Sequence, residues 1–233
     1  MENRISFWHR LINLIAPQAC AICGARLGIG EDVICSTCNL HLPRTGFASC
    51  AYDNEMARRF WARIPIERAA ALFYYEAGSE VSRIIHQLKY NDHPEIGEKM
   101  GKMAAEEFAI HGFFEGIDLI IPVPLERKRQ RQRGYNQSEE IARGVSEVTG
   151  VPVINDAVTR TTFHGSQTQK NQQQRVANVE NAFQSTGKRD LSGKHILLID
   201  DIVTSGATIC ACVDALKKMA DIKVSVFSLG VVK

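Results

Sequence analysis

The chain has 233 residues, of which 45% are hydrophobic and 23% are charged. These ordinary proportions indicate a folded protein of one large domain, or of a medium and a small one, and exclude a disordered chain, a collagen-like repeat and a coiled coil. The formal net charge of +2 is too small to indicate a nucleic-acid partner by itself. No run of about 18 apolar residues occurs, so we expect no membrane-spanning segment.

The first residues, 1–16, are predicted to form an amphipathic helix that ends at Pro17. Four apolar side chains share one of its faces: Ile5, Trp8, Ile12 and Ile15. Charged residues interrupt the apolar run, so the segment does not resemble a secretory signal. We expect the apolar face to pack against the rest of the protein, with contact to a membrane surface or a partner as the alternative.

Cysteines are concentrated near the start of the chain. Seven occur in total, and an odd number without a secretory signal argues against a secreted disulfide framework, so we expect a cytoplasmic protein. Four of them form two CxxC pairs: Cys20, Cys23, Cys35 and Cys38. Each CxxC turn can aim two sulfur atoms at one point, and four thiolates complete the tetrahedral shell of a structural zinc ion. The alternatives are four free thiols or two redox-active pairs.

The zinc site divides the chain into two expected domains. Residues 1–50 would hold the N-terminal helix and a zinc-binding segment that folds mainly through its metal. Residues 51–233 would form the main domain, in which residues 51–65 are predicted to be a linker or irregular segment. The remaining cysteines are predicted to be buried, Cys50 as a free thiol and Cys210 and Cys212 in a helix core.

From residue 69 onward, strand and helix patterns alternate. The predicted strands are residues 69–75, 117–121, 196–199 and 223–232. The predicted helices are residues 81–90, 96–111, 138–149 and 208–219. This alternation predicts an α/β fold with a mostly parallel sheet flanked by helices. Residues 160–182 are polar and rich in Gln, which indicates a mobile or ligand-ordered segment.

The most informative stretch is residues 195–208, HILLIDDIVTSGAT. Its buried strand is followed by Asp200 and Asp201 and then by a loop of small residues that opens a helix. Such a loop exposes backbone N–H groups at a helix N-terminus and suits a phosphate. Two carboxylates beside an anion site would hold sugar hydroxyls or a magnesium ion. The stretch therefore predicts a ligand with a phosphate at one end and a diol or metal at the other.

Residues 197–208 resemble the phosphoribosyl pyrophosphate (PRPP) signature of the type I phosphoribosyltransferases. The resemblance implies that Asp200 and Asp201 contact the ribose hydroxyls. It also implies that a five-residue loop holds the 5′-phosphate: Thr204, Ser205, Gly206, Ala207 and Thr208. Magnesium would accompany PRPP in such a protein.

Further motifs resemble those of the ComF family of competence-associated proteins. This resemblance extends along the chain from about Cys20 to the last strand. The motifs are the double CxxC, Lys89-Tyr90, the run RGYNQSE at residues 133–139, and Arg175, Asn178 and Phe183. This resemblance implies Mg-dependent phosphoribosyl transfer to an acceptor that the sequence does not identify. It also links the protein to DNA uptake.

Residues 126–135 contain five Lys or Arg side chains. The resemblance implies that this segment is the flexible loop that closes over PRPP, with Arg133 and Lys89 contacting the pyrophosphate. One alternative is a solvated basic loop. Another is single-stranded DNA binding, in which Tyr135 and Phe163 would stack on bases.

Three hypotheses for the function remain open at this point. The first is a phosphoribosyltransferase enzyme. The second is a non-catalytic module that binds PRPP or a nucleotide and handles single-stranded DNA during uptake. The third concerns only the zinc segment, as a nucleic-acid contact rather than a hood over the active site. Residues 20–50 offer only two Lys or Arg side chains, Arg26 and Arg44, which favours the hood.

Overall fold

The computed structural model describes residues 18–90, 93–161 and 182–233. A four-stranded sheet in the order β1-β6-β5-β2 runs through its centre, and all neighbouring strands are parallel. Its strands are β1 (Arg68–Tyr75), β2 (Leu119–Pro122), β5 (His195–Val203) and β6 (Lys223–Val232). A parallel bridge between Ile120 and Val153 extends the edge beyond β2. The helix expected over residues 1–16 lies outside the described residues.

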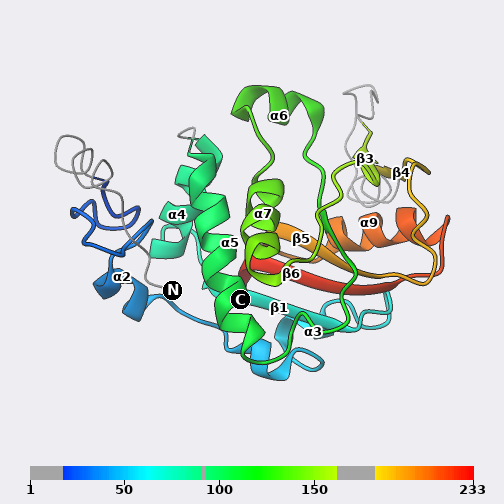
Figure 1. The fold of residues 1–233 in the computed structure, drawn as a ribbon, viewed down its shortest axis with the longest axis horizontal. Coiled ribbons are helices and arrows are strands. Elements are labelled where there is room, and N and C mark those ends of the chain that lie inside the picture. Colours follow the sequence, from blue (N-terminus) through cyan, green and yellow to red (C-terminus); the bar gives the residue numbers. More distant parts are fainter. Residues whose placement is uncertain (1–17, 91–92, 162–181) are drawn as a thin grey trace, which may run out of the picture.

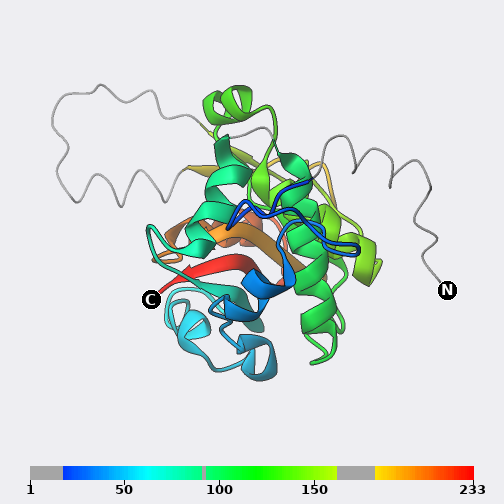
Figure 2. The same ribbon diagram turned by 90° about the vertical axis from the view of Figure 1, so that its left-hand side faces the viewer.

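Helices cover both faces of this sheet, as the alternating pattern predicts (Figures 1 and 2). They are α4 (Glu80–Tyr90), α5 (Pro94–Ala109), α7 (Gln137–Thr149) and α9 (Ala207–Lys217). Figure 2 shows α5 and α7 on one side of the sheet and α9 on the other. Helices α5 and α7 approach closely because glycine stands at their contact: a Cβ on Gly144 would lie 1.8 Å from the Glu98 carbonyl oxygen. Within the described ranges, none of the helices has the length and hydropathy that crossing a bilayer requires.

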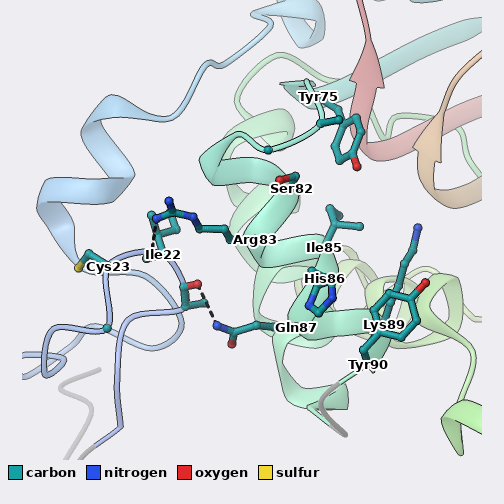
Figure 3. Close-up of a pocket in the computed structure, with 14 residues that line it drawn as sticks. Ile22, Cys23, Tyr75, Ser82, Arg83, Ile85, His86, Gln87, Lys89 and Tyr90 are labelled. Atoms are coloured by element: carbon teal, nitrogen blue, oxygen red, sulfur yellow. Dashed lines mark hydrogen bonds between the residues drawn. The ribbon is translucent and has the colours of Figure 1, made fainter.

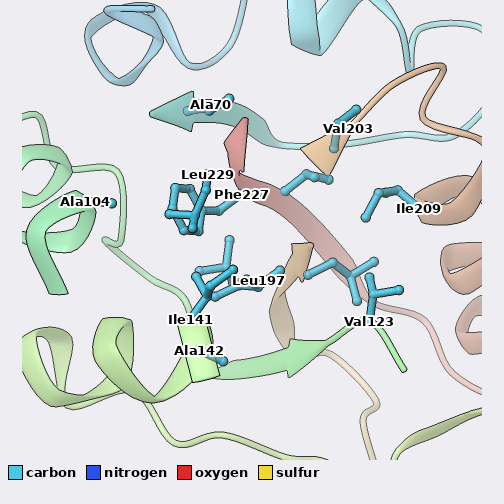
Figure 4. Packing of buried hydrophobic residues seen from close by; sticks show 14 of the residues in the cluster. Ala70, Ala104, Val123, Ile141, Ala142, Leu197, Val203, Ile209, Phe227 and Leu229 are labelled. Carbon is cyan, nitrogen blue, oxygen red and sulfur yellow. The ribbon is translucent and has the colours of Figure 1, made fainter. Parts of the chain in front are cut away.

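The hydrophobic core fills the space between the sheet and these helices (Figure 4). Leu197 of β5 and Phe227 of β6 are fully buried at its centre. Ile141 from α7 and Ile209 from α9 are buried as well. Strands buried on both faces read as continuous apolar runs, and this explains why residues 196–199 were recognisable as a strand from sequence.

Strand β5 is longer than the sequence predicts, because it continues through its two acidic residues. Asp200 stands opposite Ser228 of β6, and Val203 stands opposite Val231. Asp200 and Asp201 are therefore held in the strand and do not follow it. This places both carboxylates at the carboxyl end of the sheet, where open α/β folds bind ligands.

Residues 51–65 are not a linker; they form the irregular segment that was the other alternative, with one short helix in it. They contain α3 (Glu55–Arg58), whose first turn is capped by the Asn54 side chain, which accepts hydrogen bonds from the N–H groups of Met56 and Ala57 at 2.9 Å. Met56, Ala57 and Phe60 are fully buried. The segment is short and irregular, so its apolar residues show no helical period in sequence, yet it packs as part of the core.

The basic segment 126–135 is also not the expected loop: seven of its residues form α6 (Arg127–Arg133), which ends at Gly134 with a φ of +80°. Lys, Arg and Gln are good helix formers, which explains the helix, whereas the loop was expected from the family resemblance. The structure adds two antiparallel strands that the sequence did not reveal, β3 (Val158–Arg160) and β4 (Phe183–Ser185). Residues 162–181, which hold most of the Gln-rich segment and Phe163, Arg175 and Asn178, lie outside the described residues.

Nearer the start of the chain, the structure contains α2 (Ser36–His41) and a 3-10 helix, η1 (Phe47–Cys50). Cys50 ends η1 with its side chain exposed, so the expectation of a buried thiol was wrong. The reason is that η1 turns Phe47 and Ala48, rather than Cys50, toward the core. Cys210 and Cys212 are buried in α9, as predicted.

Candidate functional site

Two carboxylates lie side by side at the end of β5. Asp200 Oδ1 accepts a hydrogen bond from Ser138 Oγ at 3.2 Å and from the Asp201 N–H at 2.9 Å. Asp201 Oδ2 lies 2.6 Å from Lys89 Nζ, and the two side chains of this ion pair are only 15% and 21% exposed. The structure thus brings together three residues that the sequence analysis placed in one site.

Burial sets the protonation of this acid pair. Removal from water and then the neighbouring charge of Asp201 raise the pKa of Asp200 to about 7. Hydrogen bonds from the Asp201 N–H and Ser138 and the charge of Lys89 act in the opposite direction but do not cancel the increase. Asp200 therefore takes up a proton more readily than an exposed carboxyl group does.

The carboxylates open into a polar cavity of about 220 Å³. Its charged lining residues are Asp200, Asp201, Lys89, Arg129, Arg133 and Arg160. Four cations against two acids give a wall that attracts an anion while leaving acceptors for hydroxyl groups. Thr208 also lines the cavity, whereas Thr204, Ser205 and Gly206 lie on the loop that precedes α9 and Ala207 is the first residue of that helix.

That loop ends at Gly206, the N-cap of α9, which has a φ of +75°. The Ser205 hydroxyl oxygen accepts a hydrogen bond from the Ala207 N–H at 3.4 Å. In the described parts of the chain, nothing accepts a hydrogen bond from the N–H groups of Ser205 and Gly206. Such free N–H groups at a helix N-terminus form an anion site. The loop expected to bind phosphate therefore has the geometry to do so.

Replacing Gly206 with alanine should destabilise the protein by about 2–4 kcal/mol, because the left-handed backbone disfavours a Cβ and the core would be overpacked. A Cβ on Gly206 would lie 2.7 Å from the Phe60 ring. Gly193→Ala is the matched control, since Gly193 has a φ of +71° but no atom within 4 Å of its Cβ position. Urea unfolding should show a loss of only about 1–2 kcal/mol for the control. Equal losses would mean that Phe60 does not support the loop.

Arg133 lies at the edge of the cavity and is held from two sides. Its Nη1 donates to Gln137 Oε1 at 2.7 Å, and its guanidinium lies 5.2 Å from the centre of the Tyr90 ring. The Tyr135 hydroxyl donates to the Leu88 carbonyl at 2.6 Å, which ties this segment to α4. The basic segment is thereby fixed beside Lys89.

Sequence reasoning missed the contribution of the α7 N-terminus. Ser138 bonds to Asp200, and Gln137 lines the same cavity at 2% exposure. Gln137 Nε2 is a buried donor without an acceptor among the described residues. Since an unpaired buried donor is costly, this amide is available to a ligand oxygen. The signal lay in Asn136, a helix cap that places the next two residues at the ligand end of the sheet.

Two larger hollows adjoin this cavity and share Lys89 and Tyr90. One of about 730 Å³ is lined by those residues and by α6, including Arg129 and Arg131. The other, of about 880 Å³, lies between α4 and the first cysteine pair (Figure 3). Tyr90 is 64% exposed between them. A cationic and aromatic surface thus continues outward from the acid pair.

The four predicted metal ligands come together. The sulfur atoms of Cys20, Cys23, Cys35 and Cys38 all lie within 4.8 Å of one another. Four sulfurs at about 2.3 Å from one zinc ion are separated by about 3.8 Å, and the Sγ atoms of Cys23 and Cys35 are 3.9 Å apart. The Cys35 N–H donates to Cys20 Sγ at 3.3 Å, as in a metal-binding turn. The donor set and spacing fit a metal ion.

The four-cysteine cluster is docked on α4. Gln87 Nε2 donates to the Ala21 carbonyl at 2.9 Å, and Arg83 Nη1 donates to the Ile22 carbonyl at 3.2 Å (Figure 3). Both acceptors lie inside the first CxxC turn. The same helix carries Lys89 at its last turn, so the cluster supports the helix that reaches the acid pair.

Residues 86–226 match the family described as phosphoribosyl transferase domain. The chain is 27% identical over 226 residues to the DNA utilization protein YhgH of Escherichia coli strain K12, which covers 93% of this chain and 98% of that protein. It is 31% identical over 114 residues to Competence protein F of Haemophilus influenzae, covering 48% of this chain and 50% of that protein.

Among solved structures, the glutamine PRPP amidotransferase of B. subtilis aligns with 60% of this chain and 30% of its own, at 20% identity and a TM-score of 0.40. A hypoxanthine phosphoribosyltransferase of Trypanosoma cruzi aligns with 59% of this chain and 74% of its own, at 14% identity and a TM-score of 0.36. The family match spans more than half of the chain. The protein therefore belongs to the phosphoribosyl transferase domain family, with DNA utilization and competence proteins among its homologues.

Proposed function

We propose that the protein binds PRPP together with Mg²⁺ and transfers its phosphoribosyl group to an acceptor. The observation that carries this proposal is the cavity in which Asp200 and Asp201 face four cationic side chains beside the loop before α9. A diol, a terminal phosphate and a pyrophosphate are the three groups that such a surface would recognise together. Membership of the phosphoribosyl transferase domain family supports it.

Each part of the site has a separate task in this reaction. Asp200 and Asp201 would accept hydrogen bonds from the ribose hydroxyls, and the N–H groups of Ser205 and Gly206 would hold the 5′-phosphate. Lys89 and Arg133 would stabilise the negative charge that develops on the departing pyrophosphate.

The remaining contacts would orient this leaving group. Arg129, Arg160 and the Gln137 amide line the same cavity and would contact pyrophosphate oxygens. Mg²⁺ bound with the pyrophosphate would supply further neutralisation of its charge.

A second candidate is a non-catalytic module that binds PRPP or a nucleotide and handles single-stranded DNA. The hollow beside α6 favours it, because Arg129, Arg131 and Arg133 line it together with the exposed Tyr90, whose ring contacts Arg133. Cations that contact phosphates and an aromatic ring that stacks on a base are the usual means of binding single strands. The names of the relatives, DNA utilization protein and Competence protein F, agree with such a role.

We further propose that the four cysteines hold a structural zinc ion and that the protein works in the cytoplasm, where thiols stay reduced. Four thiolates fill the tetrahedral shell, which leaves no open position for catalysis. The zinc segment, within a first domain of residues 1–50, would form a hood beside the active site of the second domain, residues 51–233. Its hydrogen bonds to Arg83 and Gln87 support this arrangement.

One experiment separates the two candidate functions. The full-length protein is incubated with Mg²⁺, PRPP and a panel of nucleobases, amines and single-stranded oligonucleotides, while pyrophosphate release and PRPP binding are measured separately. Acceptor-dependent release supports the transferase. PRPP binding without release, with salt-dependent binding of the oligonucleotide, supports the module. Absence of PRPP binding contradicts the transferase, and absence of oligonucleotide binding as well contradicts both.

A further inference from the structure

Two arginines from the segment after α3 lie against the loop that precedes α9. Arg63 Nη1 donates to the Ser205 carbonyl at 2.7 Å. Arg59 donates through Nη1 to the Thr204 carbonyl and through Nη2 to the Val232 carbonyl at the end of β6. Arg59 thus joins the loop to β6, although it lies 145 residues before Thr204 in the sequence.

These contacts determine which way the loop presents its N–H groups. A trans peptide is planar, and its C=O and N–H bonds point in opposite directions. The Thr204 carbonyl shares a peptide with the Ser205 N–H, and the Ser205 carbonyl shares one with the Gly206 N–H. When guanidinium groups hold both carbonyls on one side, both N–H groups must face the other side, which is the arrangement an anion needs.

The segment that carries the arginines is firmly supported. Asn54 caps α3 and also donates to the Ala69 carbonyl of β1 at 2.8 Å. Phe60 is fully buried and lies directly beneath Gly206. Ala62 adopts a φ of +60°, a conformation that non-glycine residues seldom adopt, and it turns the chain between the two arginines. The backbone that carries Arg59 and Arg63 is therefore fixed by buried contacts before any ligand binds.

We propose that Arg59 and Arg63 are positioning residues for the phosphate group of the ligand. They touch the loop from behind and hold its peptide planes in the anion-binding orientation, and their two positive charges favour an anion at the N–H side. The inference rests on the proposed function, because it explains how the loop is kept ready for a 5′-phosphate. It concerns neither the acid pair nor the pyrophosphate end of the cavity.

The test measures two probes by calorimetry on purified full-length variants. Ribose 5-phosphate reports on the loop, and Mg-pyrophosphate reports on the other end of the site. Arg59→Ala and Arg63→Ala should each weaken ribose 5-phosphate binding by about tenfold, the value of one charge-assisted hydrogen bond. Mg-pyrophosphate binding should stay within about twofold. Arg58→Ala is the matched control, because Arg58 pairs with Asp53 at 2.7 Å and does not reach the loop.

Lysine variants separate positioning from a general loss of structure. Arg63→Lys can still bond one carbonyl and should recover most of the affinity for ribose 5-phosphate, whereas Arg59→Lys cannot bond two carbonyls on different elements and should not. If the alanine variants do not fold, the difference in ribose 5-phosphate affinity between the two lysine variants tests the inference. Equal weakening of both probes, or equal behaviour of the two lysine variants, would overturn the inference. Failure of the wild-type protein to bind ribose 5-phosphate would instead reject the proposed function.

Discussion

An Asp200→Asn variant should be more stable than the wild-type protein at pH 8, and it should bind PRPP about 100-fold more weakly. The weaker binding follows from the loss of charge-assisted hydrogen bonds to the ribose hydroxyls. The greater stability follows from the pKa of Asp200, which burial and the charge of Asp201 raise from 3.8 to about 7. Ionising this carboxyl in the folded protein is unfavourable, and an amide avoids that step.

The expected pH dependence has a definite sign. Because the pKa is higher in the folded state, the folded protein binds the proton more tightly, and the contribution of Asp200 to stability is present below about pH 4. This contribution is lost as the pH rises through about 7, the pKa in the folded state. Urea unfolding across this pH range should show that the free energy of unfolding of the wild-type protein decreases as the pH rises. This decrease should be absent in the Asp200→Asn variant.

Asp190→Asn serves as the control, since a hydrogen bond from the Ser192 N–H lowers the pKa of Asp190. Asp190 therefore contributes stability at neutral pH that is lost on acidification, which is the opposite sign. Its replacement should leave PRPP affinity unchanged. Wild-type affinity in Asp200→Asn, or an unaltered pH profile, would remove this carboxyl from the site.

The second large effect concerns the four-cysteine cluster. A Cys20→Ser/Cys38→Ser variant should contain no zinc, whereas the wild-type protein should contain one ion per chain. Binding of structural zinc to small peptides is worth about 10–16 kcal/mol, and a segment as small as residues 18–42 cannot replace this with its own core. Hydrogen exchange should therefore show loss of protection in this segment, while β5 and β6 remain protected.

The variant should also loosen α4, because Arg83 and Gln87 lose the carbonyls of Ile22 and Ala21. Cys50→Ser is the matched control: Cys50 is exposed and lies outside the cluster, so zinc content and exchange should not change. Full protection of residues 18–42 in the zinc-free variant would show that the metal is not needed for the fold.

Local sequence patterns were sufficient to predict those elements whose burial produces a regular spacing of apolar residues. The predicted helix 81–90 corresponds to α4, and its apolar stripe of Val81, Ile84, Ile85 and Leu88 is buried. The four cysteines were recognisable because two short turns suffice to bring their ligands together. The acid pair and loop were recognisable because strand, acids and helix start are contiguous.

Contacts between distant segments left no such pattern. Phe60 supports Gly206, and Arg59 reaches Thr204, only because the chain folds back on itself. Strand β5 extends beyond Ile199 because β6 continues to pair with it. The sequence did not predict this extension, because Asp200 ends the apolar run from which the strand was recognised. Gln137 lies in the cavity because α7 begins beside β5, a placement that no periodicity reveals.

A crystal structure of the full-length protein with PRPP and Mg²⁺ provides the most direct measurement. We expect the ribose hydroxyls within hydrogen-bond distance of Asp200 and Asp201, and the 5′-phosphate on the N–H groups of Ser205 and Gly206. Arg133 and Lys89 should contact the pyrophosphate. A structure with PRPP bound elsewhere, and with the Lys89–Asp201 pair and the loop before α9 unchanged and free of ligand, would contradict the assignment of this cavity.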